Sequence, residues 1–280
     1  MTLLHRIAAL ALVLTVGGCA TATTARLREV REFAAESAKL DAFAALTTRY
    51  CATYQREKPY LSAAADSRER ALDARRRTAC PDFLKVQQAV VLYMQTLGRL
   101  AGAEQQDVGA PIKEAGAGIQ AWPDSGLDER HVDAYTALGR LLAQTLTSSY
   151  RDKAAQEMLR DGDAPVRSLL EAMAALLRHY DKSNANEQGI VLGLFEVEIA
   201  FADAPRDRLL ATLARAHHQH KAAEYALAAR RHSLAEQHLA AIAEGQRALL
   251  AYLAQQPDAA PPGASLGIRA SRVALDTSTY

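Results

Sequence analysis

Two histidines and a glutamate in the carboxyl-terminal third of the chain have the spacing of a metal-binding set. His217, His220 and Glu224 lie at positions i, i+3 and i+7 of the segment AHHQHKAAEYA, so a helix would place them on one face. Imidazole nitrogens and a carboxylate on one face are suited to Zn²⁺ or Cu²⁺. His232 and His238 follow further along the same segment. The spacing therefore defines one candidate metal site, and Zn²⁺ or Cu²⁺ is the one cofactor that the sequence suggests.

The same histidines also have a structural interpretation. Every seventh residue of this segment belongs to one series, which consists of Leu213, His220, Leu227 and Leu234. The series predicts a seam that packs on a partner helix, in which His220 is a hydrogen-bonded polar interruption. His217 would then face solvent or a neighbouring helix. Three interpretations stay open, and a packed or solvated cluster is favoured over a metal site and over a pH-sensitive contact.

Other catalytic constellations are scarce. A di-iron site in a four-helix bundle needs two inward Glu-x-x-His pairs, and the chain contains none. No P-loop motif occurs, and the glycine pattern at 116–121 follows no predicted strand, so it does not indicate a dinucleotide site. Glu196 and Glu198 have the types of an acid–base pair, but their spacing is equally that of surface charges. We therefore predict a protein that is not an enzyme.

The charge composition argues against a nucleic-acid partner. The chain has 33 basic and 32 acidic residues, for a formal net charge of +1, so no strong positive field exists. The basic cluster at 68–77 is interpreted as the solvated side of a helix. Basic residues are not interleaved with aromatic ones in the way that single-strand binding requires.

The amino terminus has the layout of a secretory signal peptide. Arg6 and the free amine form a basic region, an apolar run follows over 7–16, and small residues come next. The apolar run is about half the length that a bilayer-spanning helix needs. A permanent membrane helix is therefore not expected here.

The sequence VGGC at 16–19 resembles the lipobox of bacterial lipoproteins. The resemblance covers only the first 20 residues. It implies cleavage before Cys19, a diacylglycerol on the Cys19 thiol and acylation of the new amine. Ala20 and Thr21 follow, and the absence of aspartate there implies outer-membrane sorting in Gram-negative members of this class. The resemblance thus implies a lipid-anchored envelope protein that contacts the membrane through its amino-terminal lipid and faces the periplasm.

With Cys19 assigned to the lipid, Cys51 and Cys80 remain. An even pair of cysteines in an oxidising compartment predicts a disulfide. The bridge would close a loop of about 30 residues, which contributes roughly 3–4 kcal/mol in the chain-entropy model. A redox or metal-binding thiol pair is the alternative, and the absence of a Cys-x-x-Cys motif weakens it.

Composition and periodicity predict an all-α fold. Hydrophobic residues make up 49% of the chain, many of them alanine, and aromatic residues only 6%, which favours packed helices over sheets. The last predicted helix, 203–256, would be on the order of 75 Å long. We predict one elongated antiparallel helical bundle, or two, with a very long carboxyl-terminal helix. Earlier helices are expected at about 24–58, 62–78, 81–102, 112–121, 127–159, 165–180 and 189–201.

Proline and polar clusters set the predicted breaks. Pro59 and Pro81 separate the first three helices, DGDAP at 161–165 is a predicted turn, and DKSNANEQG at 181–189 is a predicted loop. The stretch at 189–201 fits either a strand or a helix. We favour the helix because a lone strand would have no partner.

The predicted division of the chain runs as follows: a signal peptide at 1–18, a lipidated tether at 19–24, an amino-terminal bundle part at 25–102, a Gly/Pro-rich linker or crossover at 103–126, a carboxyl-terminal bundle part at 127–256, and a disordered or loosely docked tail at 257–280. Trp122, in the linker, is interpreted as a plug that packs on the bundle.

These features predict a membrane-anchored envelope lipoprotein that acts as a non-catalytic structural or protein-interaction module for an envelope protein partner. The alternative is a periplasmic metal- or small-ligand-binding protein that uses the face of His217, His220 and Glu224 or a cavity between helices. An envelope hydrolase is the least supported interpretation.

Overall fold

The structure is a computed structural model, which describes residues 24–103, 112, 118–145, 151–202 and 205–255. Within these ranges the chain is helical almost throughout and has no strand, so the predicted all-α class is confirmed. The predicted signal peptide, Cys19, the tether before Thr24 and the tail at 257–280 lie outside the described residues. None of the described helices is long and apolar enough to cross a bilayer.

The main helices are α2 (Asp41–Cys51), α3 (Thr53–Glu57), α4 (Ala63–Leu100), α6 (Glu129–Thr145), α7 (Arg151–Phe201) and α8 (Arg208–Gln255). Residues 24–35 are also helical. Four 3-10 helices connect or extend these elements: η1 (Glu36–Leu40), η2 (Lys58–Tyr60), η3 (Pro123–Ser125) and η4 (Pro205–Asp207). The predicted very long carboxyl-terminal helix is α8, and α7 is longer still.

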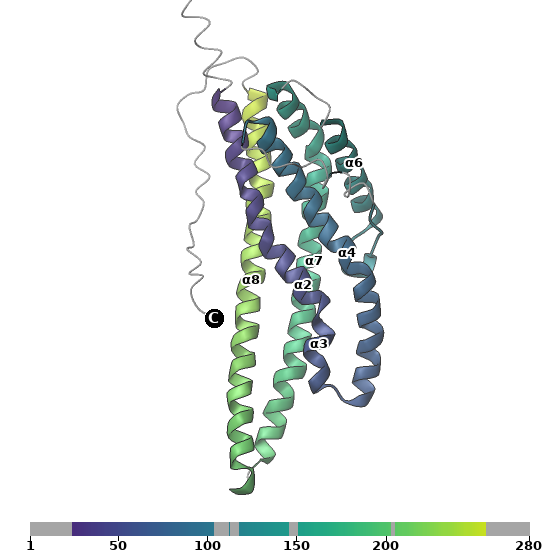
Figure 1. Ribbon diagram of the computed structural model, residues 1–280, viewed down its shortest axis with the longest axis vertical. Coiled ribbons are helices and arrows are strands. Elements are labelled where there is room, and N and C mark those ends of the chain that lie inside the picture. Colours follow the sequence, from purple (N-terminus) through teal and green to yellow (C-terminus); the bar gives the residue numbers. More distant parts are fainter. Residues whose placement is uncertain (1–23, 104–111, 113–117, 146–150, 203–204, 256–280) are drawn as a thin grey trace, which may run out of the picture.

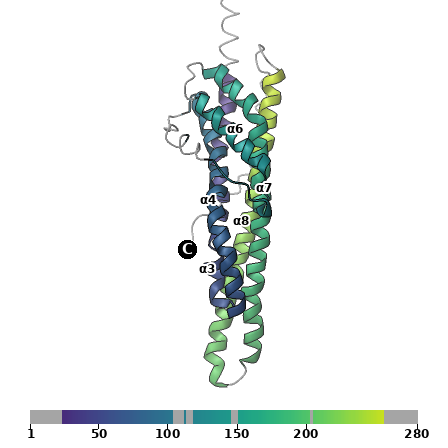
Figure 2. The same cartoon turned by 90° about the vertical axis from the view of Figure 1, so that its right-hand side faces the viewer.

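The helices form one elongated bundle around α7, which makes its most extensive contacts with α8, α6 and α4 (Figure 1). One apolar core contains residues from both predicted bundle parts, among them Phe43, Phe83 and Tyr180. The helix of residues 24–35 lies at the same end of the molecule as the carboxyl end of α8. The turn between α7 and α8 forms the opposite end, where this hairpin extends past the other helices in both views (Figures 1 and 2).

Two predicted breaks inside α7 are wrong. Residues 161–165 and 181–189 are helical, and Pro165 lies inside the helix. The polar residues of the second segment are not in a loop because their side chains serve the interior. Asn184 and Glu187 are buried and accept hydrogen bonds from Arg49 and Arg56. Tertiary contacts therefore decide the structure of this stretch against its local composition. The helix expected at 189–201 is confirmed as the end of α7.

The single helix predicted at 127–159 is also wrong, because the structure has two helices there. The first, α6, ends at Thr145, and the second, α7, begins at Arg151. The two helices then pack side by side. The last residues of the predicted helix at 112–121 are also not helical from 118 onward, and most of its remainder lies outside the described residues.

The predicted break at Pro81 is wrong as well. Ser62 caps α4 as predicted, with its hydroxyl accepting a hydrogen bond from the Ala65 amide, but the helix continues through Pro81 to Leu100. Both neighbours of Pro81 are fixed from outside α4. Cys80 forms the disulfide to Cys51, with a Cα–Cα distance of 6.1 Å, and Asp82 accepts hydrogen bonds from the segment around Trp122. The predicted disulfide is confirmed.

Two leucines of the predicted seam of α8 are not covered within this chain, since Leu213 is 59% and Leu227 48% exposed. Tyr225 and His232 of the buried face stand two positions before Leu227 and Leu234 of the seam. Residues two positions apart lie on nearly opposite sides of a helix. The members of the buried face recur at alternating steps of three and four residues from Tyr225 onward, as heptad packing requires. They are Tyr225, Ala228, His232, Ala235, Leu239, Ile242, Gln246 and Leu249.

Gly162 of α7 lies in close contact with Tyr93 of α4. A Cβ atom added there would clash with the fully buried ring of Tyr93, with the Tyr93 hydroxyl oxygen 3.1 Å away. Gly162→Ala is therefore expected to lower the free energy of unfolding by about 1–3 kcal/mol, as measured by urea denaturation.

The matched control is Gly189→Ala in the same helix, where no atom lies within 4 Å of the added Cβ. That substitution is expected to raise the free energy of unfolding by up to about 1 kcal/mol, because alanine is the better helix former. Equal effects of the two substitutions would contradict the close contact between Gly162 and Tyr93.

Candidate functional site

The predicted metal-binding face lies on α8 beside η2. The Nε2 atom of His217 lies 2.8 Å from the hydroxyl of Tyr60, and its ring packs at 5.2 Å from that of Phe195. His220 is exposed, and its ring centre is 6.5 Å from that of His217. The structure thus brings the two histidines near each other, and His217 contacts a neighbouring element of the bundle.

Glu224, the third predicted ligand, is engaged by cations. It accepts hydrogen bonds from Arg49 and Lys221, each at 2.8 Å. Burial alone would raise the pKa of Glu224, but these two hydrogen bonds outweigh it and lower the pKa to about 2. No group of three or more His, Cys, Asp or Glu side chains in the described part of the chain is placed to hold a metal ion. The Zn²⁺ or Cu²⁺ site stays a prediction of the sequence.

Next to Glu224 lies a buried carboxylate that joins three helices. Glu187 of α7 has no exposed surface, and Arg56 of α3 donates to both of its oxygens, at 2.8 and 2.6 Å. The hydroxyl of Tyr225 on α8 donates to the same carboxylate at 3.0 Å. A buried charge of this kind requires partners, so Glu187 fixes α3 and α8 against α7.

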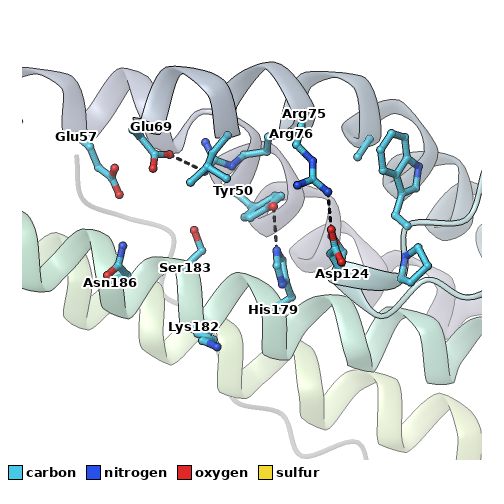
Figure 3. A pocket seen from close by; sticks show the side chains of 15 residues that line it. Tyr50, Glu57, Glu69, Arg75, Arg76, Asp124, His179, Lys182, Ser183 and Asn186 are labelled. Atoms are coloured by element: carbon cyan, nitrogen blue, oxygen red, sulfur yellow. Dashed lines mark hydrogen bonds and ion pairs between the residues drawn. The ribbon is translucent and has the colours of Figure 1, made fainter. Parts of the chain in front are cut away.

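A cavity of about 500 Å³ opens between α4 and α7 (Figure 3). Its size is within the usual range for small-molecule sites, roughly 300–1,000 Å³. Tyr50, Leu72 and Trp122 contribute apolar wall, and Ser183 and Asn186 contribute polar groups from α7.

The η3 segment forms one end of the cavity and is fastened to α4. The indole Nε1 of Trp122 donates to Asp82 at 3.0 Å, and Arg75 donates to Asp124. Trp122 is partly buried against the core, which agrees with its interpretation as a plug, and it also lines the cavity. These contacts hold the η3 end of the cavity in place without a ligand.

Glu57 lies at the other end of the cavity and has an unusual environment. It is only 1% exposed, yet its Oε2 atom has no hydrogen-bond partner among the described residues. Burial is the largest cause that raises its pKa, followed by the charges of Glu69 and Glu187. Arg76 and Arg56 act in the opposite direction, and the result is a pKa of about 7.

The other charges that line the cavity are mostly paired among themselves. Arg76 donates to Glu69 at 2.7 Å and covers the ring of Tyr50, while Arg75 pairs with Asp124. Lys182 also lines the cavity, but this residue is exposed to solvent. Glu57 is therefore the buried charge of this lining that has no ion pair among the described residues.

Sequence reasoning named a cavity between helices as an alternative but did not find Glu57. In the sequence this residue is one of several charges in QREKP, and nothing in its spacing distinguishes it. Its environment depends on residues more than 100 positions away, such as Ser183 and Glu187.

A separate surface lies at the tip of the α7–α8 hairpin. Tyr60 contacts Phe195 and His217, and beyond that contact the hairpin consists of α7 and α8 alone (Figures 1 and 2). Six of the eight large apolar side chains that are exposed among the described residues lie between 194 and 213. We call these six the apolar tip: Leu194, Val197 and Phe201 of α7, and Leu209, Leu210 and Leu213 of α8.

The exposed charges at the apolar tip divide between the two helices. Glu196 and Glu198 are exposed on α7, whereas Arg208 and Arg215 are exposed on α8. One helix of the hairpin therefore has an acidic surface here, and the other a basic surface.

The fold and these sites define an all-α helical bundle with an interhelical cavity and an apolar hairpin tip among its described residues. Comparison of the chain with protein-family models, curated proteins and solved structures gives no match.

Arg56 is expected to be essential for stability because Glu187 is fully buried. Arg56→Ala removes both hydrogen bonds of the bidentate pair and should lower the free energy of unfolding by about 3–5 kcal/mol in urea denaturation. Arg247→Ala is the control, since Arg247 and its partner Glu244 are 62% and 65% exposed. The control should change stability by less than about 1 kcal/mol. Similar losses in both variants would contradict the proposed role of Glu187.

Glu57 is expected to make stability fall as the pH rises. Its pKa increases from an ordinary value of 4.5 to about 7 on folding, so the native state holds a proton that the unfolded state releases between these values. Stability is then lost as the pH increases from about 4.5 through about 7.

Glu57→Gln removes this dependence while it keeps the shape of the side chain. At pH 8 the variant should be more stable than the original protein by on the order of 2–3 kcal/mol, and at pH 4.5 the two should be nearly equal. Urea denaturation at both pH values measures this, with the exposed Glu244→Gln as control. A variant that is less stable at pH 8 would contradict the unpaired state of Glu57.

Proposed function

We propose that this chain is a lipid-anchored envelope lipoprotein that acts as a non-catalytic structural and protein-interaction module. Cys19 carries the anchor, in the outer membrane facing the periplasm, and the apolar tip is the interaction surface. The observation that supports this proposal best is the apolar tip itself. Exposed apolar clusters of this kind mark interaction sites on soluble domains.

The position of the apolar tip suits an anchored protein. Cys19 precedes Thr24 by five positions (24 − 19 = 5), a distance of at most about 18 Å in an extended chain. The anchor would therefore hold the end of the molecule where residues 24–35 lie. The hairpin tip is at the other end, and the 51 residues of α7 span about 77 Å. The apolar tip would thus be presented far from the membrane.

The occupant that the apolar tip suits best is a second copy of the same chain. A twofold axis parallel to the hairpin places α7 of one copy opposite α8 of the other, and the two hairpins form a four-helix bundle. The acidic end of α7 in one copy then lies beside the basic beginning of α8 in the other, so the charges of the two surfaces are complementary. This axis also leaves both amino-terminal ends on one side, as anchorage in a single membrane requires.

The seam of α8 is consistent with the same arrangement. Leu213 and Leu227 recur at heptad spacing and are exposed, so they offer a helix-packing surface that this chain does not cover. A helix of the second copy would cover at least its end at Leu213, next to the hairpin turn.

Sedimentation equilibrium of the full-length chain in detergent tests this proposal. The protein is expected to be a dimer at micromolar concentration, and Phe201→Ser combined with Leu213→Ser should yield monomers with unchanged helical circular dichroism. Leu72→Ser is the control, because Leu72 is 50% exposed on α4, away from the apolar tip. It should leave the dimer intact.

Charge exchange adds a sharper test of the arrangement. Reversing Glu196 and Glu198 to arginine should weaken the dimer, and further reversing Arg208 and Arg215 to glutamate should restore it. A protein that stays monomeric at 100 µM overturns the second copy as the occupant. Binding of the apolar tip to lipid vesicles or to a different protein without self-association would overturn it equally.

A further inference from the structure

We propose that the cavity between α4 and α7 binds a small primary amine with an apolar body, and that the Glu57 carboxylate is the counter-ion of its ammonium group. This inference does not rest on the lipid anchor or on self-association. It concerns a different part of the molecule from the apolar tip.

The unpartnered carboxyl group is the first reason. Buried polar groups in folded proteins almost always have hydrogen-bond partners, and a buried charge without one is costly. Glu57 is 1% exposed and lines the cavity, and its Oε2 atom has no partner among the described residues. A donor that enters the cavity would provide the missing hydrogen bond.

The charge left in the cavity specifies the class of donor. Arg75 and Arg76 are paired with Asp124 and Glu69, so they neutralise one another within the lining. A cation meets the unpaired carboxylate of Glu57, whereas an anionic ligand would be repelled by this buried carboxylate. The cavity therefore favours a cation over an anion.

The neighbours of Glu57 suit a primary ammonium group. Figure 3 shows Ser183 and Asn186 of α7 pointing into the same end of the cavity as Glu57. Neither side chain forms a hydrogen bond with another described residue. An ammonium group has three N–H donors and no acceptor. The carboxylate, the Ser183 hydroxyl and the Asn186 amide oxygen provide one acceptor for each donor.

The rest of the cavity suits an apolar body. Leu72 and Ala79 of α4 and the rings of Tyr50 and Trp122 line the space between the Glu57 end and η3. The volume of about 500 Å³ accommodates a ligand larger than the ammonium group alone. Ligand sites commonly combine such an apolar wall with a few polar groups that fix orientation.

The pH dependence of binding follows from the groups that face Glu57. Burial, Glu69 and Glu187 raise its pKa to about 7, while Arg76 and Arg56 oppose the increase. An amine binds the ionised form, so binding must release a proton when the pH is below this value. The affinity should fall about tenfold from pH 8 to pH 6.

Isothermal titration calorimetry of the full-length chain in detergent is the test, with 2-phenylethylamine, 2-phenylethanol and 3-phenylpropionate as probes. At pH 8 the amine is expected to bind at least tenfold more tightly than the alcohol or the carboxylate. Glu57→Gln should remove this preference and the pH dependence. Ser183→Ala should weaken amine binding several-fold, and Glu244→Gln should change nothing.

Each contrary result overturns the proposal. These results are no amine binding up to 10 mM, equal binding of amine and alcohol, preferred binding of the carboxylate, or amine binding that Glu57→Gln leaves intact. The apolar-tip variant Phe201→Ser/Leu213→Ser separates the two proposals. It should abolish the dimer and retain amine binding. Glu57→Gln should instead retain the dimer and remove the preference for the amine.

Discussion

The buried carboxylate of Glu187 requires that α3 and α8 pack on α7 as they do. A fully buried charge is tolerated only where its hydrogen bonds are complete, and those of Glu187 come from Arg56 and Tyr225 on two other helices. Apolar packing alone would allow these helices to slide along one another. The bidentate geometry between Arg56 and Glu187 specifies one register, at the level where the body of the bundle ends and the hairpin begins.

This arrangement has a consequence for the neighbouring cavity. Arg56 is committed to Glu187, and Arg76 is committed to Glu69, so neither arginine neutralises Glu57. The same packing that satisfies one buried carboxylate leaves the next one without a partner. Natural proteins accept such a cost mainly at functional sites. The packing where α3 leads into α4 explains why residue 57 is buried. It does not explain why this buried residue is a charged glutamate.

Local patterns in the sequence predicted the helical class, the Ser62 cap and the disulfide, because each depends on a short stretch or on a simple count of cysteines. They do not predict the helix at 181–189. The polar residues of this segment are typical of a loop, but Asn184 and Glu187 are buried in the bundle. The partners of these residues lie more than 100 positions away, so no local signal reports them. The cavity was unpredictable for the same reason, since its lining comes from four separate helices and η3.

The seam leucines Leu213 and Leu227 of α8 do not face the core of this chain. The inner face is built from alanines, Tyr225 and His232 in its middle part, and these small and polar residues let α8 lie close to α7 and to Arg49. Leu213 and Leu227 are left exposed. In a larger bundle another layer of helices would cover them, but a two-helix hairpin has no such layer. Apolar residues on its outer surface do not contribute to the fold of a single chain, so their presence in 194–213 argues for burial against another molecule.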